Sequence, residues 1–285
     1  MPTPPAPHPT ALHGVSRSLF IPLAVRAQAA TWCPRLDPHD ARARQLLSDS
    51  GERPQDYPSD YPTAINILWR TCAIKAMAHR FFEQHTAALG ANLGAGLSDY
   101  FQWLDNGSNQ WLDVDLPEVI GQRRRLMPPS AGRQSAMACN LRQRGWWQRL
   151  HLHRQRQPVL LVCEGVLMYM TAQEVAAFFQ EVGEHAPAGT QLVCDFISPL
   201  GIGQTIPANR HPHDHAVFTW GTARAQDMAR FHPRLQLLAE HSVAEAYGLC
   251  GQWLEAACRP LTGGPLYGLA HLQVTSRPAG QAHPR

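Results

Sequence analysis

One segment of the chain has the residue types of a nucleoside-binding turn. The segment 92–97 reads Asn-Leu-Gly-Ala-Gly-Leu, and two acids, Asp113 and Asp115, follow about 20 residues later. Glycines in a Gly-x-Gly turn after a strand let the backbone bend tightly and approach a ligand without a Cβ in the way. An acid that ends the next strand can accept both hydrogen bonds of a ribose diol. The spacing therefore predicts a nucleoside site, with Gly94 and Gly96 in its turn.

The residues after the turn narrow the ligand class. Ser98 and Asp99 stand where a dinucleotide fingerprint has its third glycine, which allows the close helix approach that a pyrophosphate needs. This favours a nucleoside without phosphates, S-adenosylmethionine (SAM), over NAD or FAD. Asp113 and Asp115 lie two residues apart on the same strand, and only one of them is expected to contact the ligand. We expect Asp115, the last residue of the strand, to face the ligand.

Strands that alternate with helices must position these residues. Thr171 and Glu174 form a capping box at the start of one helix, and the continuous apolar run at 158–163 is typical of a strand covered on both faces. The alternation predicts a parallel α/β sheet. The expected strands are 87–96, 111–115, 135–139, 158–163, 191–198, 235–238 and 266–275. The expected helices are 16–30, one beginning at residue 63, 116–126, 171–186 and 222–231, with a loop at 49–62.

The expected organisation is a single catalytic domain at 13–277 between two disordered tails, 1–12 and 278–285. The segment 13–86 is expected to supply an N-terminal lid and a long helix. The segment 199–221 is rich in glycine, proline and histidine and is long for a simple connection, which indicates a cap insertion.

Four motifs occur in a fixed order along the chain. They are Leu93-Gly-Ala-Gly-Leu97, Asp113-Val-Asp-Leu-Pro-Glu-Val119, Glu164-Gly-Val-Leu-Met-Tyr-Met170 and Asp195-Phe-Ile-Ser-Pro199. The set resembles the leucine carboxyl methyltransferase-like family, and most closely its bacterial branch of polyketide and secondary-metabolite O-methyltransferases. The resemblance implies a Rossmann-like class I domain with a mostly parallel seven-stranded sheet, helices on both faces, a last antiparallel strand and a helical lid. It implies SN2 transfer of the SAM methyl group to a carboxylate or phenolic oxygen of a small acceptor.

The resemblance also implies a set of cofactor-binding residues: Arg70, Gly94, Gly96, Asp115, Asn140, Leu141 and Glu164. Arg70 matches the family arginine that pairs with the SAM carboxylate, a task that suits the planar guanidinium. Glu164 matches a glutamate near the SAM amino group. Asn140 and Leu141 stand where the family usually has Asp-Leu beside adenine, and an asparagine carbonyl can still accept the adenine amino hydrogen.

A histidine cluster, His211, His213 and His215, lies in the expected cap insertion. Its spacing fits no closed structural zinc site and no cysteine lies nearby, so we expect no metal there. A histidine of this cluster is the candidate general base for a phenolic acceptor, and the alternative is a solvated loop.

Composition limits the other classes of function. The chain has 285 residues, 16% of them charged, and a net charge of +3, too small by itself to imply a nucleic-acid partner. The pair Trp146-Trp147 with neighbouring arginines is expected to pack on the sheet rather than stack on bases. No apolar stretch reaches about 18 residues, so no membrane span is expected. Seven cysteines without a C-x-x-C pair indicate reduced thiols in a cytosolic protein.

Two other functions stay open at this point. The chain could be a SAM-binding protein without turnover, or an NAD-dependent oxidoreductase. The sequence does not determine the oligomeric state, the acceptor, or the choice between carboxylate and phenol.

Overall fold

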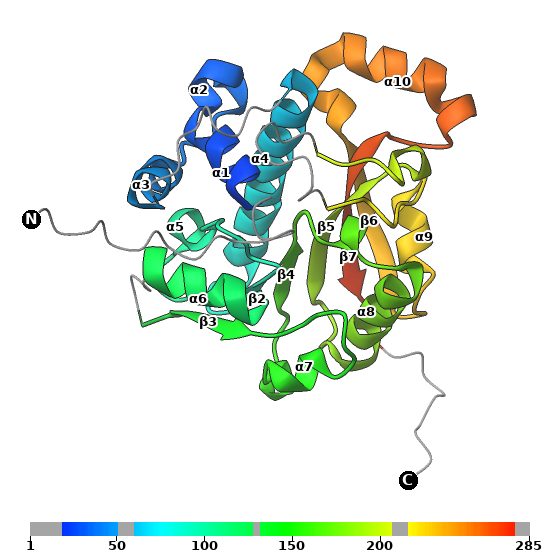
Figure 1. Ribbon diagram of the computed structural model, residues 1–285. Coiled ribbons are helices and arrows are strands. Elements are labelled where there is room, and N and C mark those ends of the chain that lie inside the picture. Colours follow the sequence, from blue (N-terminus) through cyan, green and yellow to red (C-terminus); the bar gives the residue numbers. More distant parts are fainter. Residues whose placement is uncertain (1–18, 51–59, 128–131, 207–215, 277–285) are drawn as a thin grey trace, which may run out of the picture.

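The computed structural model describes residues 19–50, 60–127, 132–206 and 216–276 (Figure 1). A seven-stranded sheet with the order β3-β2-β1-β4-β5-β7-β6 runs through it. The strands are β1 (Leu89–Leu93), β2 (Gln110–Asp115), β3 (Gln134–Ala138), β4 (Leu160–Cys163), β5 (Gln191–Ile197), β6 (Leu235–Ser242) and β7 (Tyr267–Val274). The pairs among β1 to β5 are parallel, and β7 lies antiparallel between β5 and β6. The predicted mostly parallel seven-stranded sheet with an antiparallel last strand is confirmed.

Helices cover both faces of this sheet. They are α1 (Phe20–Ala27), α2 (Ala29–Trp32), α3 (Ala41–Ser50), α4 (Tyr61–Gln84), α5 (Phe101–Leu104), α6 (Pro117–Leu126), α7 (Trp146–Arg149), α8 (Ala172–His185), α9 (Ala225–Ala229) and α10 (Gly248–Thr262). In β4, Leu160 and Val162 pack in one apolar cluster with α4, while Leu161 and Cys163 pack in a second cluster with α8. This alternation is why the strand reads as a continuous apolar run.

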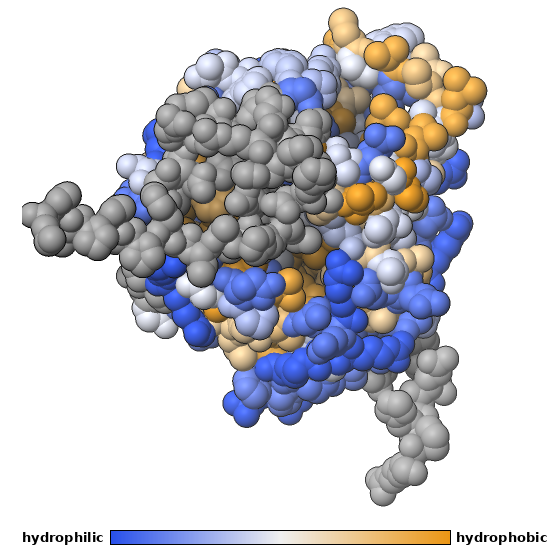
Figure 2. Space-filling view, viewed as in Figure 1, coloured by the Kyte–Doolittle hydropathy of each residue, from blue (hydrophilic) through white to orange (hydrophobic). Residues whose placement is uncertain are grey.

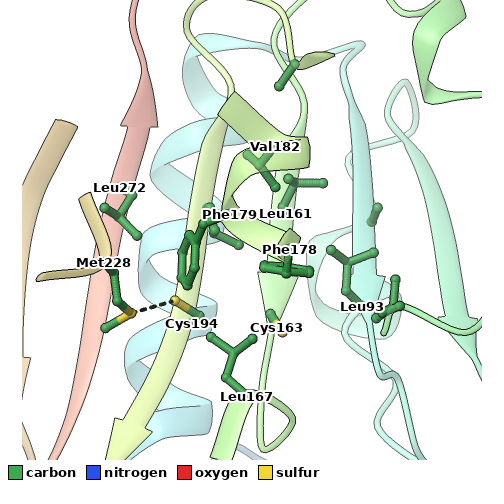
Figure 3. Packing of buried hydrophobic residues seen from close by; sticks show 14 of the residues in the cluster. Leu93, Leu161, Cys163, Leu167, Phe178, Phe179, Val182, Cys194, Met228 and Leu272 are labelled. Atoms are coloured by element: carbon green, nitrogen blue, oxygen red, sulfur yellow. Dashed lines mark hydrogen bonds between the residues drawn. The ribbon is translucent and has the colours of Figure 1, made fainter. Parts of the chain in front are cut away.

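The second cluster holds the bulkiest side chains of the core. Figure 3 shows Phe178 and Phe179 of α8 lying against β4 and β5, with Met228 of α9 beside Cys194. Trp146 and Trp147 of α7 are also fully buried in this cluster. The prediction that the tryptophan pair packs on the sheet is confirmed.

Several predicted boundaries needed correction. The helix expected at 16–30 is two helices, α1 and α2, within the described residues, and residues 16–18 lie outside them. The helix expected at 222–231 is only α9, and it begins after Arg224, whose backbone is extended. The strand expected at 235–238 continues to Ser242 across a bulge. Helix α10 was not predicted at all. The capping box of Thr171 and Glu174 is present as predicted.

The N-terminal helices lie beside the carboxyl end of β1. Arg26 of α1 forms a buried ion pair with Asp40, with 2.8 Å between Nε and Oδ2, and also donates to the carbonyl of Leu97 at 3.3 Å. A buried ion pair with good geometry holds its elements in one arrangement, since a lone buried charge is costly. The first helices are therefore attached directly to the turn that follows β1.

Candidate cofactor site

The turn after β1 needs glycine at two positions. Gly94 and Gly96 have φ angles of +79° and +50°, in the region that favours glycine. A Cβ on Gly94 would lie 2.2 Å from a methyl carbon of Val166, which leaves no room for any side chain. The amides of Gly94 and Ala95 donate to the carbonyl of Val114 at 2.8 and 2.9 Å, so the turn closes over the end of β2.

The two acids of β2 have different partners. Asp115 accepts hydrogen bonds from the amides of Gly96 (2.8 Å) and Leu116 (2.7 Å) and so lies against the glycine turn. Burial raises the pKa of Asp115, although those two hydrogen bonds oppose the shift. Asp113 forms a buried ion pair with Arg123 at 2.6 Å. The structure therefore places Asp115 at the candidate site and gives Asp113 a structural ion pair.

Helix α4 brings Arg70 over the carboxyl ends of β4 and β5. Its Nε donates to Glu164 at 2.6 Å, and its Nη1 donates to Asp195 at 3.0 Å and to the Tyr267 hydroxyl at 2.8 Å. The Tyr267 hydroxyl donates to Asp195 at 2.5 Å, and the Tyr100 hydroxyl donates to Glu164 at 2.7 Å. Five side chains from five different segments thus form one buried network.

The charges of this network favour a ligand that carries a positive charge. One guanidinium stands against two carboxylates, so the formal net charge is −1. Burial alone would raise the pKa of Glu164, but the charges of Arg70 and Arg26 and the hydrogen bonds from Tyr100 and Arg70 outweigh burial and hold the pKa below its ordinary value. Burial raises the pKa of Asp195, with the Arg70 charge opposing it. Glu164 is therefore an ionised acceptor that suits an ammonium group.

The sequence reasoning missed three members of this network. Asp195 was noted only as part of a motif, and no role was predicted for Tyr100 or Tyr267. Asp195 follows a buried run of β5, and a buried acid in that position requires a partner, so this signal was available. The tyrosines carry no comparable signal, because their partners lie 64 and 72 residues away in the sequence.

Two members of the network, Arg70 and Glu164, and the glycine turn line one pocket. Its lining residues are Leu19, Pro22, Arg26, Arg70, Gly94, Ala95, Gly96, Leu97, Ser98, Glu164, Gly165, Met168, Tyr169 and Ile206. Four predicted site residues meet there, namely Arg70, Gly94, Gly96 and Glu164, and Asp115 borders it through its bond to Gly96.

The remaining predicted residues lie elsewhere. Asn140 follows β3, where its side chain accepts from the Arg142 amide at 3.0 Å, and Leu141 is buried in the core. The end of β3 adjoins the end of β2, since the Cys139 amide donates to the Asp115 carbonyl at 2.8 Å. Neither Asn140 nor Leu141 lines the pocket, and their contact with adenine stays a prediction.

The histidine cluster His211, His213 and His215 lies outside the described residues. Across the described residues, no group of three or more histidine, cysteine, aspartate or glutamate side chains could hold a metal ion. All seven cysteines lie in described segments and are unpaired. None of the described helices is both long and apolar enough to cross a bilayer.

The residues that line the pocket fit SAM in their chemistry. The backbone of the glycine turn lines the pocket, the acid that ends β2 can serve a ribose, and the side chains of Arg70 and Glu164 offer a guanidinium and a carboxylate to an amino acid. Ligands of such sheets bind beyond the carboxyl ends of the strands, where all these residues lie. The fold and the site together define a class I SAM-dependent methyltransferase.

Comparison with known proteins gives the family. A model of the leucine carboxyl methyltransferase family matches residues 16–183, so the chain belongs to that family. The chain is 26% identical over 261 residues to the tetracenomycin polyketide synthesis O-methyltransferase TcmP of Streptomyces glaucescens, covering 88% of this chain and 93% of the relative. A crystal structure from Thermobifida fusca YX, provisionally assigned as a methyltransferase, superposes with a TM-score of 0.57 at 13% identity, covering 96% of this chain and 99% of the other, and supports the fold.

The protein is a SAM-dependent O-methyltransferase, and SAM is its cofactor. The matches favour this function over the nicotinamide-dependent alternative.

Proposed function

We propose that the protein methylates a carboxylate or phenolic oxygen of a small secondary metabolite. The observation that carries the proposal is the network of Arg70, Glu164 and Asp195 beside the Gly94 turn, in a chain similar over most of its length to a polyketide O-methyltransferase. The partner is therefore a small-molecule acceptor rather than a nucleic acid. The seven unpaired cysteines support a cytoplasmic location.

Each site residue binds a different part of the cofactor. Asp115 accepts from the ribose hydroxyls, Glu164 accepts from the amino group, and Arg70 pairs with the carboxylate. Gly94 and Gly96 lie under the methionine portion, and Asn140 with Leu141 borders the adenine. For Asp115 this requires the carboxylate to share its oxygens between the ribose and the amides of Gly96 and Leu116.

Catalysis then depends on orientation. SAM supplies a methyl group already activated by its sulfonium charge. The protein aligns the acceptor oxygen and excludes water, and orientation of this kind can contribute about 7–11 kcal/mol. The apolar side chains Leu19 and Ile206 border the pocket and support the roles of 13–86 as a lid and 199–221 as a cap.

The need for a general base depends on the acceptor. A carboxylate is ionised at neutral pH and needs none, whereas a phenol benefits from one. The described pocket residues include no histidine, and burial raises the pKa of Tyr169 to about 12, so Tyr169 is not ionised at neutral pH. We assign the candidate base to His211, His213 or His215.

Binding and turnover test the proposal separately. Titration calorimetry should detect SAM and its demethylated product and no NAD or FAD. Labelled SAM should then transfer its methyl group to members of a panel of carboxylic and phenolic metabolites, read by mass spectrometry. A folded protein that binds neither SAM nor its product would refute the methyltransferase assignment. Binding without transfer to any acceptor would refute the proposed substrate class.

A further variant set tests the base. With a phenolic acceptor, replacing the base histidine by glutamine should lower the turnover number about 10²–10⁴-fold without changing SAM affinity. The loss should shrink as the pH approaches the ionisation of the phenol itself. Wild-type turnover in all three single variants would remove the base assignment.

A further inference from the structure

Helix α10 packs against its own domain with its small and polar side rather than its apolar side. The stripe of α10 that faces the domain is small or polar: Gly251, Glu255, Cys258 and Thr262 recur at intervals of four, three and four residues. A Cβ on Gly251 would lie 2.6 Å from the carbonyl oxygen of Ala244, so the helix lies close to the 3₁₀ helix Val243–Tyr247. Ordinarily the apolar stripe of a surface helix faces the core.

Polar contacts fix this orientation. Glu255 accepts a hydrogen bond from the Ser242 hydroxyl, and Arg259 pairs with Glu240 at 3.4 Å. The Arg224 guanidinium donates to the carbonyl of Gly263, which caps the helix with a φ of +75°. The helix is thus held at its centre and at its end, and its outer side is determined.

The outer side is apolar and exposed. Leu249, Trp253, Leu254 and Leu261 are exposed to 75%, 76%, 67% and 89%. The orange region at the upper right of Figure 2 lies over α10, which projects from the sheet in Figure 1. The only charged residues of the helix are Glu255 and Arg259, and both are engaged with neighbouring side chains. We call the four exposed side chains, Leu249, Trp253, Leu254 and Leu261, the α10 patch.

We propose that the α10 patch is the interface between two copies of this chain. With Tyr247 and Leu266 at its ends, the exposed apolar side chains amount to about 500 Å², taking roughly 60–120 Å² for each leucine and 150–250 Å² for each aromatic ring. A standard interface buries about 800 Å² on each partner, of which about 56–65% is apolar. The patch therefore has the apolar area that such an interface requires.

The charge of the patch favours a second copy over a lipid surface or a charged partner protein. A lipid-binding helix carries Lys or Arg beside its apolar face, but Arg259 is the only basic residue of α10 and it pairs with Glu240. A charged partner protein would find no complementary charge. A second copy presents an equal neutral patch, and a twofold axis pairs the two helices with the same residues on both sides.

Sedimentation velocity of the full chain tests this proposal. The wild type should sediment as a dimer over a wide range of protein concentration. Trp253→Glu places a charge in the centre of the interface and should raise the dissociation constant of the dimer about 30-fold or more, as for an interface hot spot. Leu249→Glu, one turn earlier, should do the same. Both side chains are exposed in the protomer, so circular dichroism and SAM affinity should match the wild type.

Leu238→Glu is the matched control. Leu238 is also exposed and apolar, but it lies on the edge strand β6 outside the patch, and its variant should stay dimeric. A monomeric wild type, a dimeric Trp253→Glu variant, or dissociation by Leu238→Glu would each overturn the proposal. A wild-type monomer that binds phosphatidylcholine vesicles would overturn it in favour of a lipid contact.

Discussion

Asp113 and Asp115 lie two residues apart on β2, and their variants should affect different properties: Asp115 should affect SAM binding and Asp113 the stability of the fold. Asp115→Ala removes the proposed partner of the ribose diol. A hydrogen bond to a charged group contributes about 1.5–3 kcal/mol, so SAM affinity should fall about 10- to 150-fold. Titration calorimetry with SAM measures this loss directly.

Asp113→Ala should act on the fold instead. Its carboxylate is 2.6 Å from Arg123, and both side chains are almost completely buried. Removing one partner of a buried ion pair costs about 3–5 kcal/mol. The Arg123 guanidinium keeps the carbonyls of Gly96 and Ser98 as acceptors at 2.9 and 2.7 Å, which places the expected loss near the lower end. Urea denaturation measures this loss, and the affinity of the folded protein for SAM should fall much less than in Asp115→Ala.

Asp105→Ala provides the control for the ion pair. Asp105 pairs with Arg133 at 2.8 Å, but each side chain is about one-third exposed. Exposed pairs contribute about 0–1 kcal/mol, so this variant should unfold close to the wild type. Equal losses of SAM affinity in Asp115→Ala and Asp113→Ala would refute the assignment of Asp115. An Asp113→Ala variant as stable as Asp105→Ala would refute the structural role of Asp113.

Two further predictions concern β7. Tyr267→Phe removes the hydroxyl shared by Arg70 and Asp195 and should lower the free energy of unfolding in urea by about 1.5–3 kcal/mol; a change within about 0.5 kcal/mol would contradict the network. Burial, with the charges of His241 and Arg80, lowers the pKa of His271 from 6.5 to about 4. Between about pH 6.5 and pH 4 the His271 imidazole is protonated in the unfolded chain but neutral in the folded protein. The free energy of unfolding should therefore decrease as the pH falls across this window. His271→Gln should lose part of that decrease in thermal unfolding at several pH values, and an unchanged pH slope would count against it.

Local signals in the sequence predicted most of the elements. The capping box located the start of α8, and the apolar run at 158–163 located β4, because both patterns depend on neighbours in the chain. The number of strands and the antiparallel last strand came from the resemblance to a family, and the order of the strands was not predicted, since periodicity does not determine which strands pair. Helix α10 was missed, and it contains Gly251 and Pro260, two residues that disfavour the interior of a helix.

The candidate site was predicted in part for the same reason. Gly94 and Asp115 belong to a pattern with a defined spacing, and the position of Asp115 at the end of β2 distinguished it from Asp113. Tyr267 pairs with groups 72 and 197 residues away, and a single sequence contains no signal for such pairs. The contacts that complete the site are thus the ones that only the folded chain reveals.

The buried network of Arg70 and Tyr267 also has a consequence for folding during synthesis on the ribosome. Arg70 is synthesised 197 residues before Tyr267, and at about 5–20 residues per second this interval lasts roughly 10–40 s. During that time the Arg70 guanidinium lacks its partner Tyr267, because β7 has not yet been synthesised. Strand β7 lies between β5 and β6, so both neighbours emerge before the strand that joins them. Nascent chains halted before β7 should therefore lack the closed cofactor site, and the emergence of the last strand becomes the moment at which the enzyme becomes competent.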